Sequence, residues 1–449
     1  MKRVEDSVQA IDLAVEPFGW LLLAIFIIGY YFIAAEEKYH INKAKPALFT
    51  GTFMFMLLGG YYAANGLDFS AFDVEIAHLI LEIAEIFFFL FVAMTFIEAL
   101  IERNVFDALK ERLLSSGYDY KKLFWITGAI AFFLSPVADN LTTALILSTV
   151  LITIEKNNKA FLVPGAINIV VAANAGGAWS PFGDITTLMV WSAGKGAFTD
   201  FLFLFPASIS GWLITAYLLS RFIPEGSPAK IENAQPVSIH RGGKVIIFLG
   251  IFTIASAVIG KQVMHLPPMW GMLFGLSILK LYAYSLKRYQ GSDIQIYKSV
   301  SKVENDTLLF FFGILAAVGA LHFAGFLAHA VNLYTMFDPT IVNIGVGFLS
   351  AIVDNVPVMS AVLKANPALG LDQWMLVTLT AGVGGSLISF GSAAGVGVMG
   401  KLKGVYTFGS HMKMSWTILV GYFVSIAVWY LQYEMLGFYM KPVAKVAGL

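Results

Sequence analysis

Cysteine is absent from the sequence, which excludes disulfide bonds, iron–sulfur clusters and metal sites built on thiolates. Charge is scarce as well, because only 13% of the 449 residues are charged, against about 25% in ordinary soluble domains. The 29 lysines and arginines balance 29 aspartates and glutamates, so no basic surface for nucleic acid is indicated. Hydrophobic residues make up 58%, and only membrane lipid can cover so much apolar surface. The composition therefore predicts an all-α, polytopic membrane protein.

Apolar runs of about 20 residues have the length of a membrane-spanning helix. Two apolar stretches, 160–193 and 374–400, are interrupted by glycines and polar residues, and two others, 123–155 and 340–363, contain an Asp-Asn pair. We predict about ten spans, two of them broken helices, together with two re-entrant hairpins at the Asp-Asn pairs. The uninterrupted runs are 17–35, 46–64, 76–101, 200–222, 244–260, 267–284, 307–321 and 414–435.

The distribution of lysine and arginine favours this layout. If the loop 36–45 is cytoplasmic and both hairpins return to the face from which they enter, 22 of the 29 basic residues lie inside. This asymmetry agrees with the positive-inside rule, and it collapses if the Asp-Asn stretches cross the membrane. We therefore expect both termini outside. The basic residues left outside are Lys2, Arg3, Lys195, Lys261, Lys364, Lys441 and Lys445.

Two short motifs occur twice and in the same order. Residues 135–140 (SPVADN) resemble 350–355 (SAIVDN), and further along 175–184 (AGGAWSPFGD) resemble 383–392 (VGGSLISFGS). Because the two hairpins enter from opposite faces, the halves are predicted to be inverted repeats, with a binding site where the breaks meet at the midplane. The predicted divisions are a polar N-terminal segment 1–16, a first repeat 17–222, a cytoplasmic linker 223–243, a second repeat 244–435 and a C-terminal tail 436–449.

Three aspartates fall at these interruptions, namely Asp139, Asp184 and Asp354. A carboxylate at membrane depth costs about 3 kcal/mol and commonly marks an ion path. The alternative is a structural role, in which each carboxylate caps a broken helix end. Negative charge favours a small cation over an anion, and hard cations take oxygen ligands. We therefore expect a cation site at these aspartates.

Neutral oxygens close to the breaks are the other candidate cation ligands. The asparagines among them have an equally plausible role in satisfying a helix break, and the hydroxyls have a simpler role in bonding their own helix. No second polar cluster is expected at membrane depth, so the cation and protons are expected to compete for the aspartates. Glu82 and Glu85 share a helix face, and solvation at the interface is their simplest role. The remaining candidates are Asn140, Asn174, Asn355, Thr142, Thr187, Ser389 and Ser392.

The Asp-Asn hairpins and the GGAWSPFGD and GGSLISFGS breaks resemble those of NhaD-type sodium/proton antiporters of the ion transporter superfamily, and the resemblance covers nearly the whole chain. The superfamily's dicarboxylate carriers have Ser-Asn-Thr at the hairpin tips, where this chain has 139–141 (DNL) and 354–356 (DNV). The resemblance implies exchange of Na⁺ or Li⁺ for H⁺ without a cofactor. It also implies a homodimer formed through scaffold helices and a place in a bacterial inner membrane.

Two other functions compete with cation exchange. A sodium-coupled anion or metabolite carrier has the same fold, but two aspartates and no basic residue at the hairpin tips argue against it. An intramembrane aspartyl protease also needs two membrane-embedded aspartates, and the string 182–184 (FGD) faintly resembles its motif. Ser180 and Pro181 stand where a second glycine is needed, and an inverted repeat has no role in that chemistry.

Overall fold

The structure is a computed structural model that describes residues 12–39, 41–228, 237–290 and 305–437. Within these ranges the chain forms helices and no β-strand, which confirms the predicted all-α class. Parts of the predicted N-terminal segment, linker and C-terminal tail, namely 1–11, 229–236 and 438–449, lie outside the described residues.

Ten helical stretches of the described residues are long and apolar enough to cross a membrane, as predicted. Eight of them match the uninterrupted apolar runs, and the other two are the first arms of interrupted stretches. They are α1 (Pro17–Ala34), α3 (Ala44–Ala64), α4 (Ser70–Glu102), α6 (Tyr120–Ala138), α8 (Lys159–Ala178), α10 (Phe198–Leu202) with α11 (Phe205–Ser220), α12 (Gly243–Met264), α13 (Pro268–Gln290), α15 (Asn305–Phe323) and α22 (Ser415–Tyr430) with a π-helical turn (Leu431–Met435).

The ten helices that are long enough to span differ from the predicted spans at two places. Helix α6 has 19 residues, so it is long enough to cross on its own, whereas 123–155 was expected to fold back as a hairpin. The stretch 374–400 is divided between α19 (Leu371–Gly384) and α20 (Ala393–Lys401), and each is too short to span alone. The re-entrant course of the Asp-Asn stretches remains a prediction.

The chain divides into two compact units, each made from both halves of the sequence. Unit 1 comprises Met1–Ala99, Phe248–Asp338 and Met359–Pro367, and unit 2 comprises Leu100–Ile247, Pro339–Val358 and Ala368–Leu449. In unit 1, α3 packs closely against α15 because Gly51 and Gly313 bring the two backbones together, which is typical of membrane helices. Short helices complete this unit, namely η1 (Leu13–Val15), α2 (Glu36–Tyr39) and α16 (Phe326–Met336).

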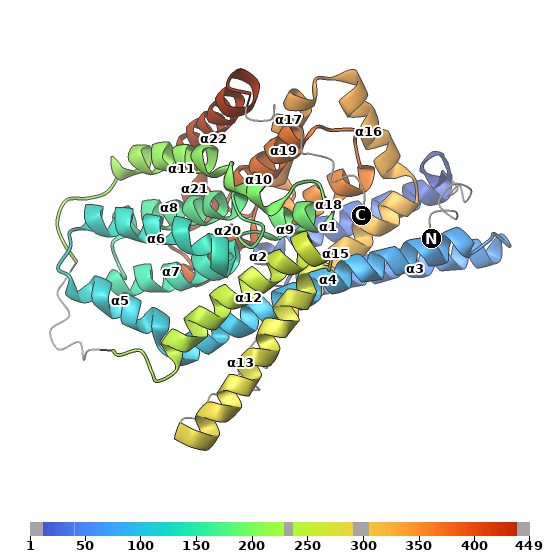
Figure 1. The fold of residues 1–449 in the computed structure, drawn as a ribbon. Helices are drawn as coiled ribbons and strands as arrows, with labels where there is room; N and C mark the ends of the chain where they lie inside the picture. Colours follow the sequence, from blue (N-terminus) through green and yellow to red (C-terminus); the bar gives the residue numbers. More distant parts are fainter. Residues whose placement is uncertain (1–11, 40, 229–236, 291–304, 438–449) are drawn as a thin grey trace. The chain divides into compact units, whose positions relative to one another are not determined.

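Unit 2 is built from helix pairs that recur in the two halves of the sequence (Figure 1). Helix α6 packs on α8, and α17 (Pro339–Ile352) packs on α19 in the same way, while α11 packs on α22. A buried asparagine ties each of the first two pairs, because Asn168 of α8 donates to the carbonyl of Phe124 and Asn343 of α17 donates to that of Gln373. The unit's other helices are α5 (Val105–Ser115), α7 (Asn140–Ile154), α9 (Ile185–Ser192) and α21 (Phe408–Met412), and α18 (Asn355–Ala365) begins in it.

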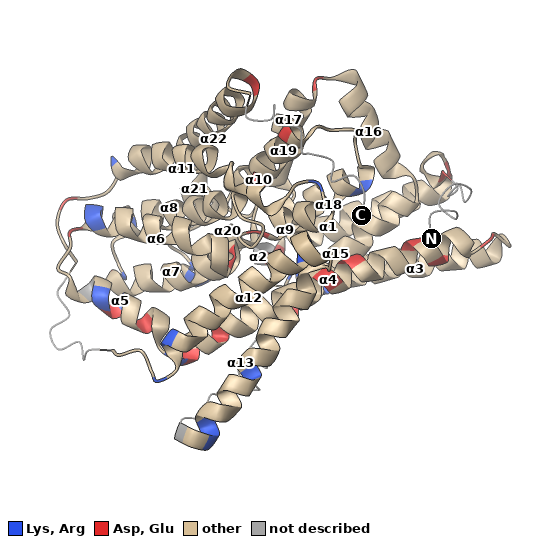
Figure 2. Cartoon of the chain, in the orientation of Figure 1, with Lys and Arg blue, Asp and Glu red and all other residues tan. Residues whose placement is uncertain are grey.

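Side-chain caps account for the start of several of these helices. Asp119 accepts a hydrogen bond from the backbone N–H of Lys122 at the start of α6, and Asn158 accepts one from Phe161 at the start of α8. Charged residues are concentrated on α5 and at the end of α13, whereas α11 has none (Figure 2). This separation is typical of helices that cross an apolar phase and of loops that stay in water.

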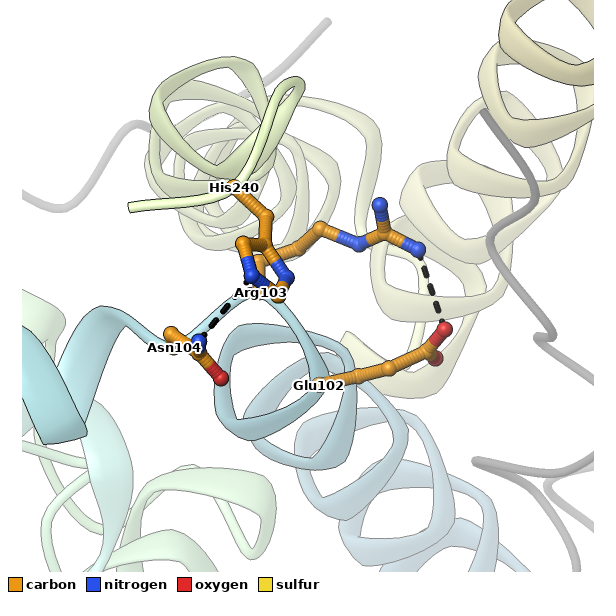
Figure 3. Close-up of polar contacts among 4 residues, drawn as sticks. All are labelled: Glu102, Arg103, Asn104 and His240. Atoms are coloured by element: carbon orange, nitrogen blue, oxygen red, sulfur yellow. Dashed lines mark hydrogen bonds and ion pairs between the residues drawn. The ribbon is translucent and has the colours of Figure 1, made fainter. Parts of the chain in front are cut away.

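The end of the linker is attached to the junction between α4 and α5 (Figure 3). The backbone N–H of His240 donates to the carbonyl of Arg103 at 2.9 Å, and its Nε2 lies 3.1 Å from Asn104 Nδ2. Arg103 also pairs with Glu102 at 3.0 Å. These contacts hold the linker against the start of α5 before the second half of the chain begins.

Candidate functional site

Four helix breaks lie in unit 2, at the motifs that recur in the sequence. Helix α6 gives way to α7 at Asp139, and α17 gives way to α18 at 353–354. The longer breaks are 179–184, between α8 and α9, and 385–392, between α19 and α20. The predicted broken helices are thus confirmed. Backbone groups freed at such breaks need polar partners, which makes the breaks the natural places for a polar site in an apolar protein.

The glycines of the two long breaks allow the chain to fold back on itself. A Cβ atom on Gly177 would collide with the carbonyl oxygen of Gly183, and one on Gly385 would lie 2.8 Å from that of Gly391. The two GG…FG strings therefore make the same close approach within each break. This close approach indicates that these glycines serve the unwound segments between the helices.

Asp184 and Ser392 occupy the same position in the two long breaks. Each is the N-cap of the helix that follows, with φ near −150° and ψ near 150°. Asp184 Oδ1 accepts from the N–H of Thr186 at 3.1 Å, and Ser392 Oγ accepts from that of Gly395 at 3.3 Å. The predicted correspondence between these residues is therefore seen in the backbone, and only the first break carries a charge.

Both Asp-Asn motifs converge on the Asp184 carboxylate. Asn140 Nδ2 donates to Asp184 Oδ2 at 2.8 Å, and Asn355 Nδ2 donates to the same oxygen at 2.9 Å. All three side chains are buried, with relative exposures of 4%, 1% and 4% for Asn140, Asn355 and Asp184. A buried carboxylate needs such donors, and two charge-assisted hydrogen bonds stabilise it. The structure thus brings together three candidate cation ligands: Asn140 and Asn355 from the two short breaks and Asp184 from the first long break.

Asn174 connects this carboxylate to the second long break. Its Oδ1 accepts from Asn140 at 3.1 Å, and its Nδ2 donates to Ser392 Oγ and Ser386 Oγ, both at 2.8 Å. The polar network therefore runs from Asn355 through Asp184, Asn140 and Asn174 to the two serines. Ser386 was not among the residues predicted from the sequence, although it lies between the two glycines and Ser392.

Asp139 and Asp354 cap helices, which was the alternative role for these residues. Asp139 accepts from the N–H and the hydroxyl of Thr142 at 2.8 and 2.7 Å, and Asp354 accepts from the N–H of Val356 at 3.3 Å. Asp354 is also close enough for its charge to act on Asp184. Asp139 has φ 56° and ψ 163°, a strained conformation for a residue with a side chain. Among the described residues, no three carboxylates or imidazoles are grouped as metal ligands.

The candidate hydroxyls have different surroundings. Thr187 Oγ1 donates to the carbonyls of Ser180 and Asp184, so it satisfies the first long break. Ser389 and Thr143 are fully buried, and their hydroxyls have no hydrogen-bond partner among the described residues. Buried hydroxyls in a protein core normally have a hydrogen-bond partner, so these unpartnered oxygens are suited to bind a cation. Thr143, next to Thr142, is also one of the hydroxyls that the sequence places close to the first Asp-Asn tip.

A second group of ionisable side chains lies on α4 in unit 1 (Figure 2). Glu82 pairs with Lys364 at 2.8 Å, and Glu75 lies 3.9 Å from His322. Glu85 and Lys261 are close enough to interact electrostatically. The sequence predicted solvation at the membrane interface for Glu82 and Glu85, and that placement stays a prediction. Their partners come from helices far apart in the sequence, which periodicity on one helix does not reveal.

Comparison with known proteins gives consistent matches. The family described as citrate transporter (CitMHS) matches residues 21–382. The Na⁺/H⁺ antiporter NhaD of Vibrio cholerae is 43% identical over 94% of this chain and 93% of its own length, and that of Alkalimonas amylolytica is 42% identical over 94% and 92%. Sodium/proton antiporter 1 of Arabidopsis thaliana is 30% identical over 90% of this chain and 71% of its own length.

Proposed function

Since the chain belongs to the citrate-transporter family and to the NhaD-type Na⁺/H⁺ antiporters, we propose that it exchanges Na⁺ or Li⁺ for H⁺. It is an integral multi-pass membrane protein, and it is a transporter rather than an enzyme. The intramembrane protease is therefore no longer a candidate. The monovalent cation and the proton are its substrates, and the chemistry requires no cofactor.

The observation that carries this proposal is the convergence of Asn140 and Asn355 on the buried Asp184 carboxylate. A carboxylate can bind either a proton or a hard cation, which is what an exchanger needs at one site. The two amides hold the carboxylate through their N–H groups. An amide that turns by about 180° about its last bond offers a carbonyl oxygen instead, which is a ligand for Na⁺.

The other oxygens proposed for the cation surround this network. Ser389 and Ser392 come from the second long break, and Ser389 has a buried hydroxyl without a partner among the described residues. Asp139 and Asp354 contribute charge at the two short breaks, and Asp354 acts electrostatically on Asp184. Asn174, Thr142 and Thr187 hold the breaks in place through the contacts described above. Cation and proton are proposed to compete for this set.

A citrate carrier is the second candidate, because the family's description names citrate. Citrate carries negative charge, and the network of Asp184, three asparagines and two serines contains no lysine or arginine to bind it. A buried carboxylate at that place repels a tricarboxylate and attracts a cation. The charge of the site therefore favours the exchanger.

Everted membrane vesicles test the proposed function directly. With an acid interior and a quenched pH-sensitive dye, addition of Na⁺ or Li⁺ is expected to restore fluorescence as protons leave in exchange. Citrate and succinate, given as salts of a large organic cation, are expected to have no effect. A response to citrate with none to Na⁺ or Li⁺ would instead identify a carboxylate carrier.

We further propose that the two halves are inverted repeats with re-entrant hairpins, placed in a bacterial inner membrane with both termini outside. The matched contacts support an internal symmetry, because Ser135 Oγ donates to the carbonyl of Ala173 and Ser350 Oγ donates to that of Ala381. These serines open the two Asp-Asn motifs. A homodimer remains a prediction of the family resemblance.

Single cysteines test the proposed orientation, since the native chain has none. A cysteine at Asn157 is expected to react with a membrane-impermeant maleimide only from the cytoplasmic side, and one at Asn366 only from outside. The excess of basic residues on one face is the physical reason. Labelling of either position from the opposite face would contradict the inverted hairpins.

A further inference from the structure

His411 is a buried histidine to which the proposed exchange assigns no role. It lies on α21, its side chain is fully buried, and neither ring nitrogen faces solvent. Its Nε2 is 3.0 Å from the carbonyl oxygen of Ser386 and 3.2 Å from that of Leu387. Its Nδ1 is 2.7 Å from the hydroxyl of Tyr406. Both carbonyls belong to the second long break, so the imidazole contacts the backbone of the candidate site.

The partners of the ring define its protonation. A carbonyl oxygen only accepts hydrogen bonds, so Nε2 carries a hydrogen, and Nδ1 accepts from the hydroxyl of Tyr406 when the ring is neutral. Burial lowers the pKa of His411 to about 4. The ring is therefore neutral at the pH values at which exchange would operate, and its role is to position other groups rather than to titrate.

The carbonyls that His411 binds are the groups that a helix break leaves free. Unwound carbonyls in transporters either bind a cation or need another donor. His411 donates to two of them, and Ser415 Oγ donates to that of Leu387 at 2.9 Å. Ser386 is held at its other end as well, because its hydroxyl accepts from Asn174. His411 and Asn174 thus fix the same residue from opposite ends.

Among the described residues of the first half, the corresponding place holds no such donor. Helices α10 and α21 are both five residues long, and both start with a capping contact from the third helical residue. Counted from these starts, Phe201 corresponds to His411, and Phe205 corresponds to Ser415. Phe201 is fully buried, as His411 is. The polar pair is therefore specific to the second half, whose break lacks the aspartate that the first break carries.

We infer that His411 is a positioning residue that holds the 385–392 break in the shape in which Ser386, Ser389 and Ser392 face the cation. This inference rests on the proposed function. In this account the first break is organised by the charge of Asp184, and the second by a neutral imidazole that satisfies its carbonyls. Hydrogen bonds then occupy one lone pair of the Ser386 carbonyl and both of the Leu387 carbonyl, and the serine hydroxyls are the cation ligands proposed from this break.

Two substitutions separate positioning from a general effect on folding. His411→Phe copies the residue of the first half and removes the donor, and we expect it to raise the Na⁺ concentration for half-maximal exchange about tenfold or more, as loss of a supporting contact does at metal sites. His411→Gln retains an N–H that can reach a carbonyl, and we expect it to restore most of the affinity. A purely structural role would instead lower the amount of folded protein and the maximal rate in both variants, with no change in affinity.

A second measurement does not depend on transport. In the cysteine-free chain, Ser389→Cys places a single thiol in the break, where Ser389 is fully buried. Adding His411→Phe is expected to increase its labelling by a small maleimide at least about tenfold, because the break opens more often. If the parent protein shows no Na⁺ or Li⁺ response, the proposed function fails, while the labelling comparison still decides the role of His411.

Two results would show that His411 does not position the 385–392 break. Unchanged labelling at position 389 in His411→Phe, together with an unchanged half-maximal Na⁺ concentration where exchange is measurable, would remove His411 from this role. If the His411 variants do not fold, Ser415→Ala decides in their place, because it removes the second donor to Leu387. It is expected to raise labelling about threefold, and no increase would overturn the inference.

Discussion

Asp184→Asn is expected to reduce Na⁺/H⁺ exchange by at least about 100-fold while leaving the protein folded and inserted. A unit cation 4 Å from a carboxylate is stabilised by about 4 kcal/mol at an effective dielectric constant of 20, which is about a thousandfold in affinity. The substitution removes this attraction, and it sets the N–H groups of Asn140 and Asn355 against a side chain that also donates. The measurement is dye dequenching by Na⁺ in everted vesicles, normalised to the amount of inserted protein.

Asp139→Asn is the matched comparison for this variant. It makes the same chemical change at a second aspartate, but Asp139 is only half-buried and its carboxylate is engaged by Thr142 at the start of α7. Asparagine retains a capping oxygen and tolerates a positive φ better than other side chains. A smaller loss is therefore expected than in Asp184→Asn. Equal losses in the two variants would contradict the central position of Asp184, and full exchange in Asp184→Asn would remove it from the site.

The second large effect is expected from Asn140→Ala and Asn355→Ala. Each removes one of the two donors that hold Asp184 Oδ2 ionised, and with it the amide oxygen proposed as a Na⁺ ligand. Hydrogen bonds to a charged group contribute about 1.5–3 kcal/mol, and their loss favours the protonated carboxyl that competes with Na⁺. We therefore expect each variant to weaken apparent Na⁺ affinity by about 10- to 100-fold. Asn140→Ala should have the larger effect, because Asn140 also donates to Asn174. The readout is the Na⁺ concentration that gives half-maximal dequenching.

Asn343→Ala is the control for a buried asparagine outside the network. Asn343 is fully buried in the same unit and bonds to Gln373 between α17 and α19. Its loss is expected to lower the thermal stability in detergent and to leave the Na⁺ affinity of the remaining folded protein close to that of the parent. If it weakens Na⁺ binding as much as Asn140→Ala does, the asparagine effects are structural and do not report on the Asp184 site.

Much of the site was predictable because its parts are local in the sequence. The Asp-Asn pairs and the paired glycines mark the breaks, since few residues allow a helix to stop at membrane depth. Asp184 and Ser392 could be matched from the repeated strings alone, and the structure gives them the same backbone conformation. Local signals of this kind identify where helices end and which polar residues lie there.

The hierarchy among the aspartates was not predictable, because it depends on contacts between distant segments. Asn355 and Asp184 are 171 residues apart, and their hydrogen bond makes Asp184 the centre of the network. Asp139, which the sequence ranked equally, binds its own helix end. The pair of Glu82 and Lys364 spans 282 residues and was missed for the same reason. A side chain's sequence neighbours do not reveal which carboxylate receives donors from both halves.

The second ionisable group also bears on the mechanism. Competition between cation and proton was expected partly because no other polar cluster was foreseen at membrane depth, and Glu82 and Glu85 of α4 were expected to be solvated at the interface. The Asp184 site itself supports competition, because its one buried carboxylate can bind either a proton or a cation.

The pH dependence of Na⁺ affinity tests the central claim, that Na⁺ and H⁺ compete at Asp184, most directly. The Na⁺ concentration for half-maximal exchange is measured in vesicles across a range of pH, with the internal pH clamped. Competition predicts that this concentration rises about tenfold per pH unit on the acid side for each proton displaced, and levels off at alkaline pH. A half-maximal concentration that stays constant while the maximal rate changes with pH would show that the two ions do not share a site.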